Sequence, residues 1–175
     1  MLNGPSQDPQ PDRPDQGGDM HHWVFRVGVA DRAGALTSIA SAFSSRGISL
    51  ETIVGHGTPH PGTEGGAIVA TFWCTEEEKD AIVRVVGRLS KVTHLEERPY
   101  ASAMLRKSAL VQVTRRLLPP DVAGQEAFLS CEQIGPPGET WTYFLAGAPS
   151  ELDPVLARLA AEGILRQTVY SVIGQ

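Results

Sequence analysis

The stretch Asp31-Arg32-Ala33-Gly34-Ala35-Leu36 joins a predicted strand to a predicted helix. Before it, apolar residues alternate with polar or small ones from 22 to 29, the period of a strand buried on one face. After it, apolar residues recur from Leu36 to Phe43 at the spacing of one helix face. Gly34 lets the backbone approach another molecule closely, and the first N–H groups of a helix have no intrahelical partner. The turn is therefore a candidate site for a small anion, built from the main chain.

The residues that follow the turn predict a compact α+β unit. Gly47 is a suitable end for the helix, and Thr75 begins a capping box that opens a second helix. The segment from 56 to 66 contains four glycines and two prolines, which is typical of a long hairpin loop. Further strands are predicted at 48–54, 67–74 and 92–98. The order βαββαβ predicts a ferredoxin-like sheet with both helices on one face.

The same plan recurs in a reduced form after residue 101. In place of a first helix, the segment from Leu117 to Phe128 contains two adjacent prolines and a glycine, which permit only a short or irregular turn. A later helix ends at Gly163, and Ser150 and Asp153 are alternative caps for its start. Strands are predicted at 109–114, 141–146 and 164–173. We expect three parts: a disordered tail at 1–20, a first domain at 21–100 and a degenerate copy of it at 101–175.

Composition narrows the classes of partner. The formal net charge of −5 opposes binding to nucleic acid, because a polyanion repels an acidic protein. No apolar run approaches the roughly 20 residues that a membrane-spanning helix needs, and the N-terminus has no signal-peptide core. We therefore expect a cytoplasmic protein that binds neither nucleic acid nor a membrane.

Candidates for catalysis or metal binding are weak. Cys74 and Cys131 have no metal-ligand or redox spacing, and we expect both to be small core residues. His21-His22 reads as a strand start, and Pro59 between His56 and His60 argues against a helical metal-binding pair. We expect no catalytic residue, no metal and no cofactor, although an enzyme using Cys74 or a histidine is a minor alternative.

The first half resembles the ACT domain, a family that binds amino acids. The resemblance rests on the βαββαβ order, the turn Asp31–Leu36 and the sequence Arg46-Gly47-Ile48 before the second strand. It extends to the regulatory small subunit of acetohydroxyacid synthase, which is similar through residues 43–51 and through Leu145-Ala146-Gly147 and residues 170–174 in the second half. The resemblance implies a homodimer of a regulatory subunit, with a thiamine-dependent catalytic large subunit as its partner.

The resemblance also implies an effector site at a dimer interface. Its residues are those of the turn of one chain and the start of the second strand of another: Asp31, Arg32, Ala33, Gly34, Ala35, Leu36, Ser49 and Leu50. The small subunit usually has asparagine where this chain has Asp31 and Ser49. An aspartate accepts a hydrogen bond from an α-ammonium group, and serine is shorter than asparagine.

Two hypotheses follow. In the first, the chain is a non-catalytic regulatory subunit that binds a branched-chain amino acid, with valine as the first candidate. In the second, it keeps the fold but has lost the effector, and acts as a scaffold or activator of a catalytic subunit of this or another amino-acid enzyme. Asp31, Ser49 and the degenerate second half favour the second hypothesis. An effector titration separates the two.

Overall fold

The computed structural model describes residues 19–30, 34–57, 65–123, 129–136 and 138–174. The predicted tail at 1–20 lies almost wholly outside these residues, as do Asp31, Arg32 and Ala33 of the turn. The elements are β1 (His21–Val29), α1 (Ala35–Ser44), β2 (Leu50–His56), β3 (Gly66–Cys74), α2 (Glu76–Val86), β4 (Val92–Pro99), β5 (Leu105–Val113), the 3-10 helix η1 (Pro119–Val122), β6 (Ser130–Ile134), β7 (Trp141–Gly147), α3 (Pro149–Ala161) and β8 (Leu165–Gly174).

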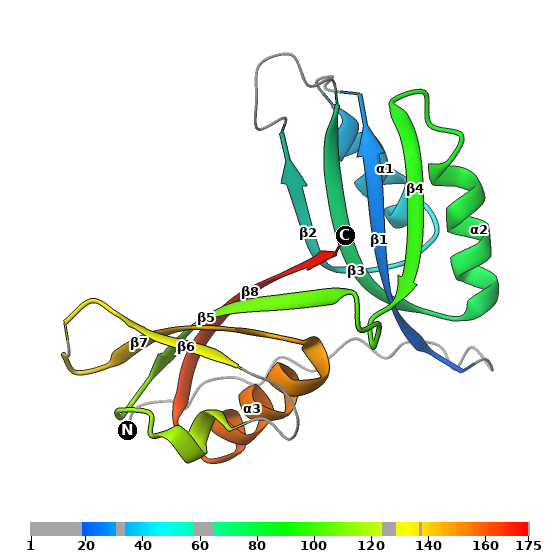
Figure 1. Ribbon diagram of the computed structural model, residues 1–175. Helices are drawn as coiled ribbons and strands as arrows, with labels where there is room; N and C mark the ends of the chain where they lie inside the picture. Colours follow the sequence, from blue (N-terminus) through cyan, green and yellow to red (C-terminus); the bar gives the residue numbers. More distant parts are fainter. Residues whose placement is uncertain (1–18, 31–33, 58–64, 124–128, 137, 175) are drawn as a thin grey trace, which may run out of the picture.

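The strands form two antiparallel four-stranded sheets with the same topology (Figure 1). The first sheet has the order β2-β3-β1-β4 and the second has the order β6-β7-β5-β8. Each sheet therefore places its first strand in the third position, and η1 occupies the place of the first helix in the second half. The predicted α+β class and the ferredoxin-like βαββαβ order are confirmed, and the second half is a reduced repeat of the first.

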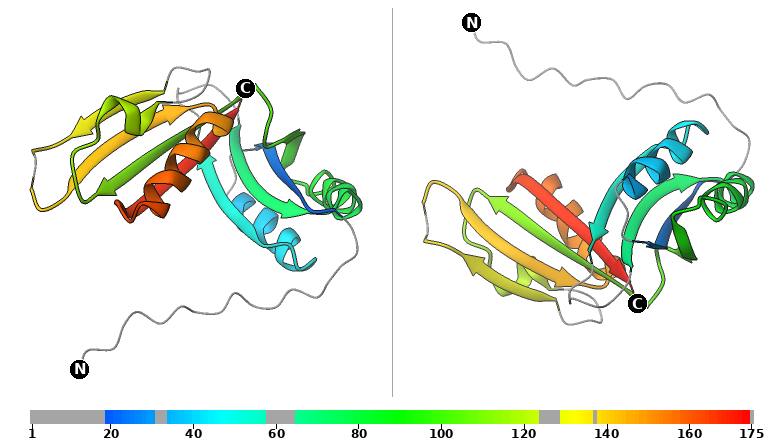
Figure 2. Two further views of the ribbon diagram at one scale, coloured as in Figure 1. Left: turned by 90° about the horizontal axis from the view of Figure 1, so that it is seen from below. Right: turned by 90° about the horizontal axis from the view of Figure 1, so that it is seen from above.

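The core of the first half lies between the sheet and its helices, which cover one face of the sheet (Figure 2). Phe25 on β1, Phe43 on α1 and Phe72 on β3 are fully buried, and their ring centroids lie 4.7–5.9 Å apart in edge-to-face geometry. Such aromatic pairs stabilise a core beyond the area that they bury. This core fixes the strand and helix on either side of the candidate turn.

The predicted start of α2 is confirmed. The Thr75 side chain accepts from the Glu78 N–H, and the Glu78 carboxylate accepts from the Thr75 N–H at 2.9 Å, which completes the capping box. Gly47, after α1, has φ +70°, a left-handed conformation that favours glycine. The capping box and the glycine after α1 were each predicted from a few neighbouring residues, and the structure confirms both.

Several expectations were wrong. Leu36 is exposed, and the buried face of α1 uses Ala35 and Ala42 instead. Cys131 is exposed, because it lies on β6, whose five residues are all exposed. Strand β6 itself was not predicted, since a fully exposed strand has no hydrophobic alternation. Helix α3 begins at Pro149, with Ala148 at its N-cap, so neither proposed cap starts it.

The two halves meet through the open face of the first sheet, the face without helices. Val24 and Val69 on that face pack against Leu105 and Val172 of the second sheet, and Tyr100 between the halves completes this small core. Figures 1 and 2 show the C-terminal end of β8 reaching the open face beside β2 and β3. In the described part of the chain, no helix has the length and apolar character that crossing a membrane requires.

Candidate functional site

The described part of the predicted turn opens into a small pocket. Gly34, Ala35 and Leu36 line it together with the ends of β1 and β2 and the start of β3. Its volume is about 210 Å³, below the roughly 300–1,000 Å³ that is usual for drug-sized ligands. Its described walls are apolar or main chain apart from His56. Such a pocket suits a small ligand held mainly by backbone groups.

Gly34 is the N-cap residue of α1 and has φ +83°, a conformation that L side chains rarely adopt. A glycine has no side chain to cap the helix, so the N–H groups of Ala35 and Leu36 are left for a main-chain or ligand acceptor. A Cβ atom at Gly34 would lie 2.9 Å from Lys91 Nζ. The Lys91 ammonium group therefore lies beside the turn. The periodicity of the sequence did not predict this neighbour.

Ser49 and Leu50 line a different hollow. It has a volume of about 390 Å³ and is also lined by residues of α1 and by Gly47. Ser49 precedes β2, whereas the turn pocket is lined by Gly55, His56 and Gly57 at the other end of that strand. Within one chain, the structure therefore separates the two groups of predicted residues.

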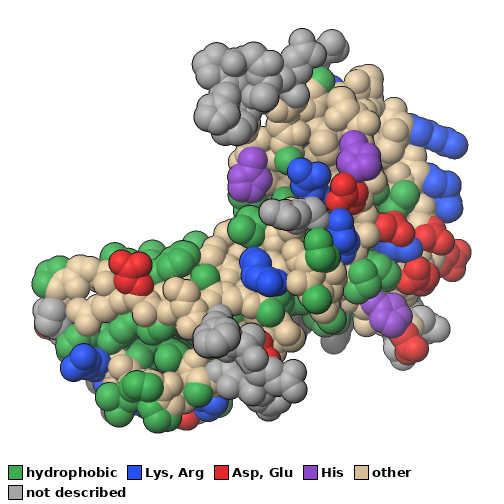
Figure 3. All heavy atoms as spheres, in the orientation of Figure 1, with side chains coloured by type: hydrophobic (Ala, Val, Ile, Leu, Met, Phe, Trp, Pro, Cys, Tyr) green, Lys and Arg blue, Asp and Glu red, His purple; other side chains and the backbone are tan. Residues whose placement is uncertain are grey.

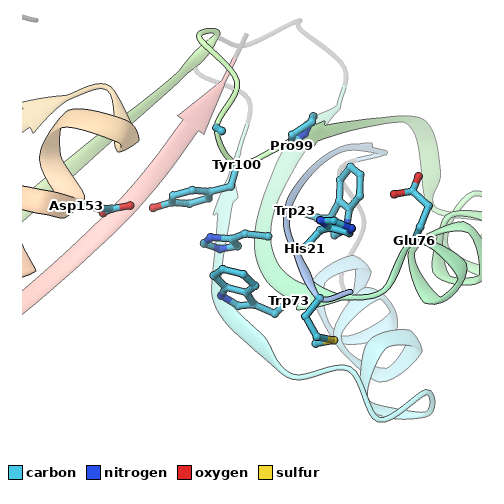
Figure 4. A pocket seen from close by; sticks show the side chains of 10 residues that line it. His21, Trp23, Trp73, Glu76, Pro99, Tyr100 and Asp153 are labelled. Carbon is cyan, nitrogen blue, oxygen red and sulfur yellow. The ribbon is translucent and has the colours of Figure 1, made fainter. Parts of the chain in front are cut away.

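A second polar feature lies where the two halves meet. The ring of His22 is stacked against the rings of Trp73 and Tyr100, which are labelled in Figure 4. The centroid distances are 4.4 Å to Trp73 and 3.7 Å to Tyr100, with interplanar angles of 16° and 12°. His22 Nε2 also lies 2.7 Å from Glu51 Oε2. We call these four residues the junction stack.

The junction stack is connected to the second half by two further contacts. The Tyr170 hydroxyl donates to Glu51 Oε1 at 2.7 Å, so one carboxylate of β2 holds groups from β1 and β8. Lys107 Nζ, on β5, donates to Asp153 Oδ1 at 2.6 Å and to the Tyr100 hydroxyl at 3.2 Å, and it lies 3.8 Å from the Tyr170 ring centroid. These contacts fix the orientation of the second half relative to β2.

A cleft of about 630 Å³ adjoins the stack, lined by Trp23, Trp73 and Tyr100 together with Glu76 and Asp153 (Figure 4). Both carboxylates already hold lysines, since Glu76 lies 2.7 Å from Lys79 Nζ and Asp153 pairs with Lys107. The cleft is therefore aromatic rather than acidic in character.

The junction stack was not predicted from the sequence. The pattern around His22 indicates only a strand start, and Tyr170 and Glu51 are 119 positions apart in the chain. Trp73 on β3 was one available signal. Alternation along the strand places Trp73 on the face opposite Phe72 and Cys74. A large aromatic side chain on that face indicates that another part of the protein packs near it.

Burial suppresses the ionisation of one cysteine and two tyrosines. Burial raises the pKa of the Cys74 thiol to about 12, so this cysteine is not an activated nucleophile at neutral pH. Burial also raises the pKa values of Tyr100 and Tyr170.

Acidic side chains gather around α2 on the first half (Figure 3), where Glu76, Glu77 and Glu78 occupy the first turn of the helix.

The junction stack predicts a pH dependence of stability. Burial lowers the pKa of His22 below 6.5, and this effect exceeds the opposing attraction of Glu51 and Asp153, while Lys107 lowers the pKa further. The unfolded chain then binds the proton more readily, so stability falls as pH drops from about 7 through the lowered pKa. We expect His22→Gln to remove this part of the pH dependence. Denaturant titrations between pH 5 and 8 measure it, and the exposed His94→Gln is the control. Equal pH profiles for His22→Gln and the parent would contradict the assignment.

The comparisons with known proteins identify the fold. No family model matches the sequence, and no curated protein is similar to it in sequence. The acetolactate synthase small subunit from Thermotoga maritima has a similar structure, with a TM-score of 0.65 over 88% of this chain and 97% of that chain at 15% identity. The ligand-free regulatory subunit of aspartate kinase from Thermus thermophilus aligns over 82% of this chain and 94% of that chain, at 18% identity and a TM-score of 0.43. The likeness to the Thermotoga maritima structure shows that the chain shares its ACT-type fold.

Proposed function

We propose that this chain is a non-catalytic, cytoplasmic regulatory subunit that binds a small branched-chain amino acid and modulates the catalytic large subunit of a thiamine-dependent acetohydroxyacid synthase. The observation that carries the proposal is the position of the turn pocket relative to the open edge of β2. The fold shared with the Thermotoga maritima small subunit supports the choice of partner. In this proposal residues 21–100 form the effector-binding domain and residues 101–175 the ACT-like C-terminal domain.

The edge strand β2 supplies the dimer interface in this proposal. It lies at the end of the first sheet, and in the described residues no strand pairs with its outer side. An open edge of this kind is a template for pairing with another chain. If two copies pair antiparallel about Ile53, Leu50 of one copy lies beside His56 of the other, and Ser49 lies beside Gly57. Both groups of predicted site residues then meet, because His56 and Gly57 line the turn pocket.

The ligand chemistry follows from this arrangement. An α-carboxylate accepts hydrogen bonds from the N–H groups of Ala35 and Leu36 at the positive end of α1. The carboxylate of Asp31, with Arg32 and Ala33 in the adjoining part of the turn, accepts from the α-ammonium group. Apolar walls such as Ile68 surround the side chain of the amino acid. Allostery then requires only that the effector prefer one of two arrangements of the dimer and its enzyme.

Two measurements test the function. Calorimetry of the purified chain with valine, leucine and isoleucine measures effector binding. Alone, the chain is expected to form no acetolactate from pyruvate, and its addition to a synthase catalytic subunit is expected to change the rate. No rate change with any catalytic subunit of the same cell would contradict the pathway. A rate change without binding of any of the three amino acids would favour the scaffold hypothesis instead.

Ser49→Asn tests the part of the site contributed by β2. Asparagine places an amide one group further into the site than serine does, and a new hydrogen bond contributes about 0.5–1.5 kcal/mol. We therefore expect branched-chain amino acids to bind Ser49→Asn roughly two to ten times more tightly than the parent. Ser102→Asn, a substitution outside both hollows, is the control and should leave the affinity unchanged. Unchanged affinity in Ser49→Asn would place this residue away from the ligand.

A further inference from the structure

The outer face of the second sheet, opposite α3, carries an exposed apolar surface. Figure 2 shows this face turned away from the helix, and hydrophobic side chains gather on the second half in Figure 3. Ten large hydrophobic side chains are exposed in the described residues, and half of them lie here. They are Leu110, Ile134, Phe144, Val169 and Ile173, which are 37–61% exposed. Contiguous apolar surface of this kind marks an interaction site more often than isolated residues do.

Strand register arranges this face in rows across the sheet. We define the apolar row as the cross-strand neighbours Glu132, Phe144, Leu110 and Val169. We define the small row as the adjoining neighbours Ser130, Ala146, Ser108 and Ser171. The two rows are about 6.6 Å apart, because alternate residues of a strand share a face. A ridge of large side chains therefore runs beside a trough of small ones.

A ridge beside a trough of equal length is complementary to a second copy of itself. Consider a two-fold axis in the plane of the interface, parallel to the two rows and midway between them. This axis places the ridge of each copy over the trough of the other. Packed sheets are rotated by about 30°, so the match is closest at the centre, where Leu110 faces Ser108. The pairs at the flanks are Phe144 with Ala146 and Val169 with Ser171.

Charge and area agree with self-association. Among the described residues that strand register assigns to the rows of this face, only Arg106 and Glu132 are charged, so these rows are neutral although the chain carries −5. Arg166, at the bulge beside Gln167, adds a positive charge at their margin. The two-fold axis places Glu132 opposite Ser130 and Arg106 opposite Gln112, so no like charges meet. Four strands about 4.8 Å apart and roughly seven residues long give a footprint near 450 Å² per copy. Because a corrugated face exceeds its footprint, a pair buries about 1,000 Å², the lower bound for a specific interface.

We propose that the outer face of the second sheet is an isologous interface between two copies of this chain. The interface is distinct from the β2 edge and does not depend on the proposed effector. In such an interface each contact between two different residues occurs twice, so one substitution acts at two places.

Sedimentation of the full chain over a range of concentrations tests the proposal. Leu110→Lys is expected to lower the average mass and to raise the dissociation constant of the contact at least tenfold. Val169→Lys, at a 61% exposed position, is a second variant with the same expected effect. Leu118→Lys is the matched control, since this leucine is 55% exposed but lies outside the face. If both face variants kept the parent's mass at every concentration, the proposal would be overturned.

A mixing experiment tests the register of the two copies. Leu110→Lys and Ser108→Asp are each expected to weaken self-association, whereas an equimolar mixture should regain it. The reason is that the introduced lysine of one copy faces the introduced aspartate of the other. A mixture with no greater average mass than either variant alone would overturn the two-fold arrangement.

Discussion

Gly34→Asp is expected to reduce the binding of branched-chain amino acids at least tenfold. An aspartate here adds a negative charge beside the proposed carboxylate position, and its Cβ would lie 2.9 Å from Lys91 Nζ. A tenfold loss corresponds to about 1.4 kcal/mol. Calorimetry with valine, leucine and isoleucine on the parent and the variant measures the loss.

Gly163→Asp is a matched control for backbone strain. Gly163 has φ +69°, close to the +83° of Gly34, and no heavy atom lies within 4 Å of a Cβ there. It follows α3 in the second half, away from both hollows. We expect Gly163→Asp to bind as the parent does. Full binding by a folded Gly34→Asp protein would place the site elsewhere.

Asp153→Asn is expected to lower the free energy of unfolding by about 2–3 kcal/mol, because it leaves the buried Lys107 ammonium without its carboxylate. The Lys107 side chain is 6% exposed, whereas that of Asp153 is 40% exposed, so water solvates the acid more readily than the base. We therefore expect Lys107→Met to cost less than Asp153→Asn, and the double variant to recover much of the loss. Denaturant unfolding of the three variants measures these differences. Equal costs for the two single variants would contradict this account of the junction.

The sequence predicted the elements whose signals are local. Alternation in β1, the capping box at Thr75 and the left-handed Gly47 each specify their own few residues, and the structure keeps all three. The repeat was predicted from the same signals, although only three of the four strands of the second sheet were among the predicted strands. Local pattern failed at β6, because its exposed residues have no buried face, and at Leu36, where helical spacing alone did not decide which apolar residues face the core.

The contacts between the two halves were not predictable from local pattern. Glu51 meets Tyr170 only because the open face of the first sheet packs against residues of β5 and β8. The predicted effector residues remain a prediction. Asp31, Arg32 and Ala33 lie outside the described residues, and within one chain Ser49 lines a different hollow from the turn.

The central claim is that the effector site combines the turn of one chain with the start of β2 of another, and mixed dimers test it most directly. Gly34→Asp damages the turn, and Ser49→Trp fills the hollow at the start of β2, so neither homodimer should bind valine, leucine or isoleucine. In a mixed dimer of the two variants, one site carries both changes and the other carries neither. Calorimetry of the purified mixed dimer should therefore give one bound amino acid per dimer with the parent's affinity. A mixed dimer that bound none, while the parent bound two, would show that each site lies within a single chain and would contradict the account.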